Sequence, residues 1–152
     1  METVLITGGT GTIGKQLTAH LLKKGYNVII VTRKIPPGNS VKTGVSYASW
    51  NINEQRMDTA ALQKADHIIH LAGAGVVDKR WSTQYKKEIL DSRTKSSELL
   101  INSMNKIDNK IKTLVSASAI GWYGPDTTSS QQYGFTEDAL PNNDFLGTTC
   151  RL

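Results

Sequence analysis

Residues 4–14 read VLITGGTGTIG, and this stretch decides the fold of the 152-residue chain. Its apolar start predicts a short buried strand that the glycine cluster ends. Apolar residues then recur at helical spacing from Ile13 to Leu22, and Gly25 stands where a helix C-terminus favours glycine. A strand, a G-x-G-x-x-G turn and a helix in this order predict the first unit of a dinucleotide-binding fold.

The residues of this turn have separate physical tasks. One glycine allows the tight turn, another lets the backbone approach a pyrophosphate, and Gly14 lets the helix pack closely on the strand. The helix N-terminus offers unpaired N–H groups and the positive end of its dipole to phosphates. The alternative is a structural turn without a ligand. We expect pyrophosphate contacts from the turn residues Gly8, Thr10, Gly11, Thr12, Ile13 and Gly14.

Strand and helix patterns alternate along the rest of the chain. Apolar runs predict strands at 28–31, 45–50, 67–71 and 113–116, and helical spacing predicts helices at 57–64 and 82–105, the latter with a break near residues 91–92. Residues 34–44 and 117–144 are rich in loop-forming residues. These patterns predict one α/β domain, residues 1–152, with a Rossmann-type doubly wound parallel sheet of about five strands.

Composition excludes several classes of protein. The net charge is +5, but the basic residues are scattered in pairs and aromatic residues are few, so no nucleic-acid partner is expected. A single cysteine excludes an internal disulfide framework. No apolar run approaches the roughly 20 residues that span a bilayer, and no signal-peptide pattern precedes the first strand. We expect a cytoplasmic protein with no membrane partner and no metal site.

The residue at the end of the second predicted strand indicates which dinucleotide is preferred. Arg33 follows Gly14 by 19 residues, and no Asp or Glu occurs between Gly25 and Asn53. A carboxylate at this place would accept hydrogen bonds from the adenosine ribose and select NAD, whereas an arginine fork suits a 2′-phosphate. The sequence therefore favours NADP(H) over NAD(H); the alternative for Arg33 is a solvated loop charge.

Several segments together resemble the extended short-chain dehydrogenase/reductases of the NAD-dependent epimerase/dehydratase superfamily. They are TGGTGTIG at 7–14, NI at 51–52, LAGA at 71–74, and SASA at 116–119 followed by YG at 123–124. A narrower likeness, to the branch labelled epimerase family proteins and sugar-nucleotide epimerases, is carried by AGAG at 72–75, KRW at 79–81, KEILDSR at 87–93, SASAIG at 116–121, FTED at 135–138 and DFL at 144–146.

The resemblance implies roles for particular residues. Asn51 would contact the adenine, and Leu71, Ala72 and Gly73 would line the adenine side of the cofactor. Arg93 is expected to reach the cofactor, with Glu88 on the same helix. An ion pair of Glu88 with Lys87 or Lys95 is the alternative. Lys79 and Arg80 are candidates for contacts with the cofactor or an anionic substrate, or form a solvated basic loop.

The catalytic pair of the superfamily is missing. None of the five tyrosines has a lysine four residues further on, and no lysine follows Lys112. The resemblance leaves Ser118 as the counterpart of the catalytic serine, or a strand-end hydroxyl, and Tyr123 as the nearest replacement acid, or a packing residue. Cys150 has no histidine near it in sequence, and His70, at a strand end, either faces the cofactor or is satisfied elsewhere.

The resemblance also implies a chain truncated to the amino-terminal half, without the later strands and the substrate lobe. An exposed last strand would then favour a homodimer through the sheet edge, or marginal stability. The expected function is the NADP(H)-binding domain of an atypical short-chain dehydrogenase/reductase with oxidoreductase or epimerase ancestry and an unknown small-molecule substrate. The alternatives are a non-catalytic NADP(H)-sensing or protein-interaction domain, and an inactive fragment.

Overall fold

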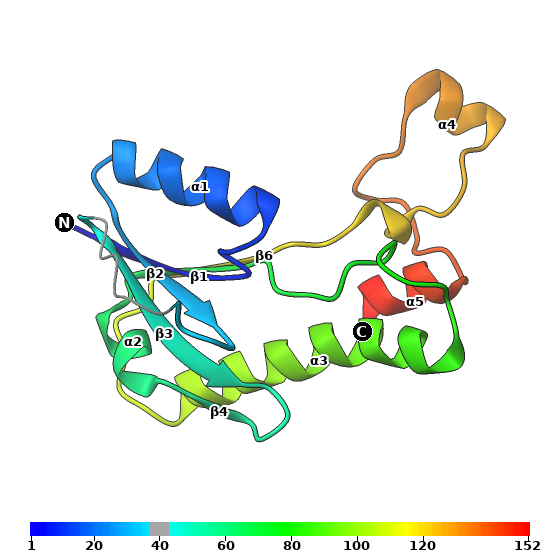
Figure 1. Ribbon diagram of the computed structural model, residues 1–152. Helices are drawn as coiled ribbons and strands as arrows, with labels where there is room; N and C mark the ends of the chain where they lie inside the picture. The colour runs from blue at the N-terminus through cyan, green and yellow to red at the C-terminus, as the bar shows by residue number, and fades with distance from the viewer. Residues whose placement is uncertain (37–42) are drawn as a thin grey trace. The chain divides into compact units, whose positions relative to one another are not determined.

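A computed structural model describes residues 1–36 and 43–152 (Figure 1). The chain divides into a first unit, Met1–Ser116, and a second unit, Ala117–Leu152, and each is described by itself. The loop predicted for residues 34–44 lies partly outside the described residues. Among the residues that are described, no helix is long and apolar enough to cross a membrane.

The first unit is built on a six-stranded sheet in the order β4-β3-β2-β1-β5-β6. Its strands are β1 (Thr3–Thr7), β2 (Asn27–Thr32), β3 (Val45–Asn51), β4 (Arg56–Met57), β5 (His67–His70) and β6 (Thr113–Ser116). All neighbours are parallel except β4, which pairs antiparallel with β3. The predicted Rossmann-type α/β fold is confirmed. Strand β4 was not predicted, because its two residues are too few to show an alternating pattern.

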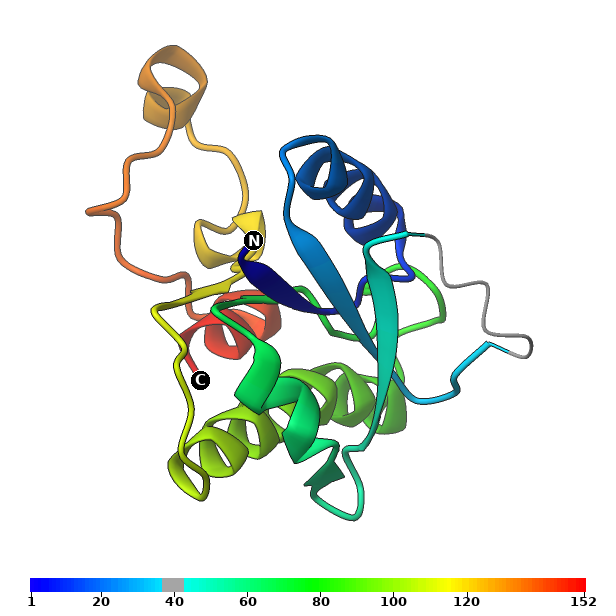
Figure 2. The ribbon, with the colours of Figure 1, turned by 90° about the vertical axis from the view of Figure 1, so that its left-hand side faces the viewer.

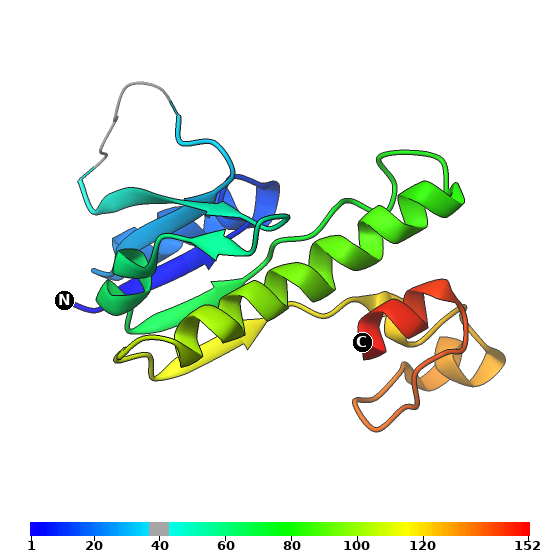
Figure 3. The ribbon, with the colours of Figure 1, turned by 90° about the horizontal axis from the view of Figure 1, so that it is seen from below.

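Helices cover both faces of this sheet. Helix α1 (Thr12–Lys23) lies on one face, and α2 (Thr59–Lys64) and α3 (Thr83–Asn105) lie on the other (Figures 2 and 3). Alternate strand residues supply the two cores. Val4 and Ile6 of β1 belong to the cluster on the α1 side, whereas Leu5 packs with the apolar residues of α2 and α3. Burial on both faces explains the continuous apolar runs in the sequence.

Helix α3 is continuous, so the break predicted near residues 91–92 is wrong. Asp91 forms ion pairs with Lys87 and Lys95, one turn before and one turn after it. Ser92 donates its hydroxyl proton to the Ile89 carbonyl of the same helix at 2.9 Å. Both polar residues therefore bond along the helix surface instead of interrupting it.

Two of the other helical predictions change, one in its boundary and one in its apolar face. The helix expected over 57–64 begins at Thr59, because Asp58 is its N-cap and accepts the Ala60 N–H at 3.0 Å. Ile13 is 72% exposed and so does not join the apolar face of α1.

The second unit contains helical structure where a loop was predicted. It comprises the 3₁₀ turn η1 (Ile120–Trp122), α4 (Thr128–Tyr133) and α5 (Phe145–Arg151). A reciprocal capping box between Thr127 and Ser130 starts α4 within a polar segment. The prediction of loop as far as Asp144 is therefore wrong at α4.

Candidate cofactor-binding site

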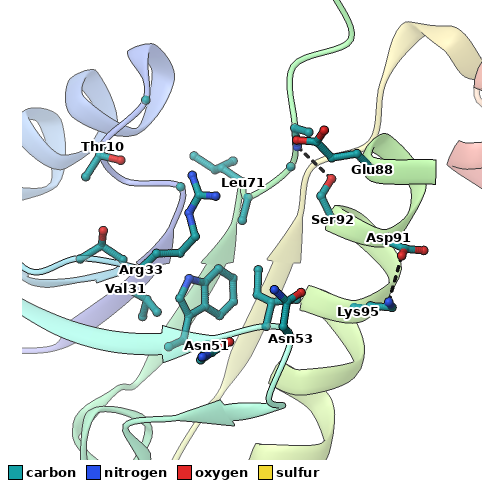
Figure 4. A pocket seen from close by; sticks show the side chains of 18 of the residues that line it. Thr10, Val31, Arg33, Asn51, Asn53, Leu71, Glu88, Asp91, Ser92 and Lys95 are labelled. Atoms are coloured by element: carbon teal, nitrogen blue, oxygen red, sulfur yellow. Dashed lines mark hydrogen bonds and ion pairs between the residues drawn. The ribbon is translucent and has the colours of Figure 1, made fainter. Parts of the chain in front are cut away.

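An open groove of about 1310 Å³ lies at the carboxyl ends of β1, β2, β3 and β5. Ligands of open α/β sheets bind at this edge. The groove is lined by nine of the predicted cofactor residues, namely Gly8, Thr10, Gly11, Arg33, Asn51, Leu71, Ala72, Gly73 and Glu88. Figure 4 shows side chains from the strand ends on one side of it and Ser92, Asp91 and Lys95 of α3 on the other.

The glycine turn forms one end of the groove through close backbone packing. Gly8 has φ +71°, a conformation that favours glycine. A Cβ atom on Gly14 would lie 2.5 Å from the Gly9 Cα and closer still to the Gly8 carbonyl oxygen. At Gly11 the same test finds only the Gly8 oxygen, at 3.3 Å, within 4 Å. Gly14 therefore packs the turn, whereas Gly11 borders open space in the groove.

Helix α1 begins at this turn without a side-chain cap. Its N-cap is Gly11, and its first turn holds no acidic residue. In the described parts of the chain, each of the other α-helices has a capping side chain at its N-terminus. The first N–H groups of α1 thus remain available for an external acceptor. Such a terminus, bordered by Gly11, fits the pyrophosphate of a dinucleotide.

The ends of β2 and β3 form the middle of the groove. Arg33 is exposed directly after β2, and among the described residues no ion pair is formed by its guanidinium. Asn51 is exposed at the end of β3, and its Oδ1 accepts the Glu54 N–H at 3.2 Å. Thr12 and Ile13 are exposed beside the turn but do not line the groove.

Helix α3 brings charged side chains to the opposite wall. Glu88 pairs with Lys79 at 3.2 Å, so the alternative that it pairs with Lys87 or Lys95 is wrong. Those two lysines bind Asp91 instead, at 2.6 and 2.9 Å. Their hydrogen bonds, that of Lys87 first, lower the pKa of Asp91. The acidic residues of this wall are therefore compensated by neighbouring lysines.

Two residues singled out in the sequence bind protein groups. Arg93 does not line the groove; its Nη1 donates to the Ala74 carbonyl at 3.1 Å and to the Ile89 carbonyl at 3.0 Å. His70 is buried between Thr7 Oγ1, 2.6 Å from its Nδ1, and Ser96 Oγ, 3.2 Å from its Nε2. Burial lowers the pKa of the His70 ring. His70 is thus satisfied inside the protein.

The candidate catalytic residues belong to the second unit. Ser118 lies between β6 and η1, and Tyr123 follows η1. The Tyr123 ring stacks on Phe135 with a centroid distance of 4.8 Å and an interplanar angle of 16°. The Cys150 Sγ lies 3.8 Å from the Ala119 carbonyl oxygen. The stacking contact favours the interpretation of Tyr123 as a packing residue.

Comparison with known proteins agrees with this geometry. Residues 4–145 match the NAD dependent epimerase/dehydratase family. The chain belongs to this family. An epimerase family protein of Staphylococcus aureus strain MRSA252 is 36% identical over 126 residues, which are 83% of this chain and 40% of the relative. The epimerase family protein YfhF of Bacillus subtilis is 34% identical over 150 residues, 98% of this chain and 47% of the relative. The chain spans less than half the length of these two relatives.

Two solved structures, of an epimerase family protein and of an epimerase, share the fold. The human epimerase family protein, isoform 2, with NADPH superposes with a TM-score of 0.76 and 29% identity, over 97% of this chain and 45% of that one. The UDP-N-acetylglucosamine 4-epimerase of Bacillus cereus gives a TM-score of 0.71 over 99% of this chain and 46% of that one. At 23% identity, the second likeness shows the fold alone.

Several groove residues of this family member were not predicted from sequence. They include Ser49, Trp50, Asn53, Asp78, Tyr85, Asp91 and Ser92. Trp50 and Asn53 flank the predicted Asn51, so the position of the third strand end could have indicated them. Ser92 lies beside Arg93 in the KEILDSR segment, but nothing local shows that its hydroxyl accepts the Ala74 N–H.

Proposed function

We propose that this chain is the NADP(H)-binding domain of an atypical short-chain dehydrogenase/reductase. The observation that carries the proposal is the groove, where the uncapped α1 terminus and Arg33 present positive groups at the same edge of the sheet. The pyrophosphate would bind at Gly11 and the 2′-phosphate at Arg33. The human relative solved with NADPH supports this choice, although other structural neighbours were solved with NAD.

Calorimetric titration with NADPH and NADH tests the proposal. A lost charge-assisted hydrogen bond is worth roughly 1.5–3 kcal/mol, so Arg33→Met should weaken NADPH about 10- to 100-fold and leave NADH nearly unchanged. Lys34→Met is the matched control, because Lys34 is an exposed neighbouring cation that does not line the groove. Binding of NADH but not NADPH to the unaltered protein would refute the assignment of Arg33.

The proposed reaction of the whole protein is hydride transfer between the nicotinamide and a small molecule, as in a nucleoside-diphosphate-sugar epimerase or oxidoreductase. The second candidate is an NADP(H) sensor or interaction protein without turnover. The missing Tyr-x-x-x-Lys pair favours this candidate. Transfer of label from 4-deuterated NADPH into carbonyl metabolites by the full-length protein would support the enzyme, and binding without transfer would support the sensor.

The edge strand β6 underlies one further expectation. Within the described residues, β6 pairs with β5 alone, and Val115 is 54% exposed. A homodimer through this edge is proposed on that ground, and size-exclusion chromatography with light scattering tests it. The cytoplasmic location stays a prediction from the sequence.

A further inference from the structure

We infer that Ser92 and Arg93 are positioning residues that hold the Gly73–Ala74 turn in the shape that lines the groove. The turn belongs to the segment between β5 and α3, and both Gly73 and Ala74 face the groove. This inference rests on the proposed function, because the ligand that the turn would contact is the dinucleotide.

Two adjacent side chains of α3 hold the two polar backbone groups of Ala74. Ser92 Oγ accepts the Ala74 N–H at 2.9 Å, the dashed line from Ser92 in Figure 4. Arg93 Nη1 donates to the Ala74 carbonyl oxygen at 3.1 Å. Residues 71–80 form no helix or strand, so their backbone groups need partners outside a regular ladder. The Ser92–Arg93 pair supplies both partners for Ala74.

A common anchor fixes these two side chains on α3. Ser92 Oγ donates to the Ile89 carbonyl at 2.9 Å, and Arg93 Nη1 donates to the same carbonyl at 3.0 Å. The Ile89 side chain is fully buried. The serine and the guanidinium are therefore held by a part of the helix that cannot move without disturbing the core.

The Arg93 guanidinium also packs closely against Gly73. A Cβ atom on Gly73 would lie 3.1 Å from Arg93 Cζ and 3.3 Å from Nη2. The plane of the guanidinium thus packs against the glycine while Nη1 bonds to the next residue. A lysine would keep the charge but has neither the plane nor the fork.

The start of the same segment is connected to α3 through buried polar groups. Thr7 Oγ1 accepts the Ala72 N–H at 3.3 Å and lies 2.6 Å from His70 Nδ1. Ser96 Oγ, 3.2 Å from His70 Nε2, donates to the Ser92 carbonyl at 2.6 Å. These hydrogen bonds are mutually compatible when Thr7 donates to Nδ1 and Nε2–H is shared between the Ser96 and Ser97 hydroxyls, at 3.2 and 3.3 Å. Both ends of the turn therefore depend on the stretch of α3 that includes Ser92.

Amide hydrogen exchange of the ligand-free protein tests the coupling between the two halves of this clamp. Of the two hydrogen bonds that hold Ala74, Arg93→Lys alters only the one to the carbonyl. It should still speed exchange of the Ala74 N–H, which bonds to Ser92, by about tenfold. Thr94→Ala is the control, because Thr94 bonds to the Leu90 carbonyl of the same helix and does not contact the turn. Unchanged Ala74 exchange in Arg93→Lys, with the fold retained by circular dichroism, would overturn the inference.

Cofactor titration gives the second readout. Arg93→Lys and Ser92→Ala should weaken NADPH and NADH by the same factor, whereas Arg33→Met changes their ratio. A loss confined to NADPH would show that Arg93 binds the 2′-phosphate directly and would overturn the positioning role. If the unaltered protein binds neither dinucleotide, the proposed function fails, and the Ala74 exchange rates still decide whether the clamp exists.

Discussion

Gly14→Ala tests whether the glycine turn is fixed by backbone packing. The added methyl group would lie 2.5 Å from the Gly9 Cα and 2.8 Å from the Gly9 carbonyl carbon. Both atoms belong to the backbone, so the conflict cannot be relieved by rotating a side chain. Ordinary van der Waals contact begins near 3.4 Å, and the turn or the start of α1 must therefore move by nearly 1 Å.

Two opposing effects set the size of the change in stability. Alanine in place of glycine within a helix gains up to about 1 kcal/mol. Overpacking costs about 1–3 kcal/mol, and contact with backbone atoms places this site at the upper end. We expect a net loss of about 2 kcal/mol in the free energy of unfolding. The same displacement breaks hydrogen-bond geometry at the α1 N-terminus, so NADPH affinity should fall at least about tenfold.

Gly11→Ala separates ligand binding from packing. Gly11 has φ −74°, which alanine adopts readily, and an added Cβ atom would meet only the Gly8 oxygen, at 3.3 Å. This variant should lose less than about 1 kcal/mol of stability but bind NADPH weakly, because its methyl group enters the groove. Urea unfolding and calorimetric titration measure the two effects. A Gly14→Ala protein with the stability and affinity of the unaltered chain would refute the packing argument.

Two further predictions concern the core. Burial lowers the pKa of His70 below its ordinary value of 6.5, so the stability linked to its neutral ring is complete above about pH 6.5 and is lost as the pH falls through the folded-state pKa. The urea midpoint of His70→Gln should depend less on pH in that range, and an NMR titration showing the His70 ring protonating at or above pH 6.5 would contradict this. Ile68→Ala removes a side chain with 0% exposure and should cost about 2–5 kcal/mol by urea unfolding; a loss below 1 kcal/mol would contradict its place in the core.

The parts of the fold that could be predicted from sequence are those in which the cause is local. The strand–glycine–helix stretch at 4–14 and the apolar run at 28–31 each contain their own signal, and both elements are confirmed. The arginine that stands in place of a carboxylate after β2 is an equally local signal. It predicted a ligand contact at Arg33, and Arg33 lines the groove. Short-range capping could also have indicated α4, since Thr127 and Ser130 have the spacing of a capping box.

The remaining errors arise from contacts that the sequence does not display. Asp91 and Ser92 resemble helix breakers, yet ion pairs and a carbonyl bond within α3 keep the helix continuous. Glu88 pairs with Lys79, nine residues earlier in the chain, and not with Lys87 or Lys95 of its own helix. Arg93 donates to the Ala74 carbonyl, 19 residues earlier in the chain, and no local pattern indicates this bond.

The two turns that line the groove are stabilised in different ways, and this difference bears on how affinity can be adjusted. At the glycine turn, shape follows from close backbone contacts between Gly14 and residues 8–9, so nearly any side chain added there alters it. The Gly73–Ala74 turn instead depends on side chains of α3, which substitution can change one hydrogen bond at a time. Each such bond is worth about 1 kcal/mol, or severalfold in affinity. Graded, severalfold changes in dinucleotide affinity should therefore arise from α3, whereas changes in the glycine turn should lower affinity about tenfold or more.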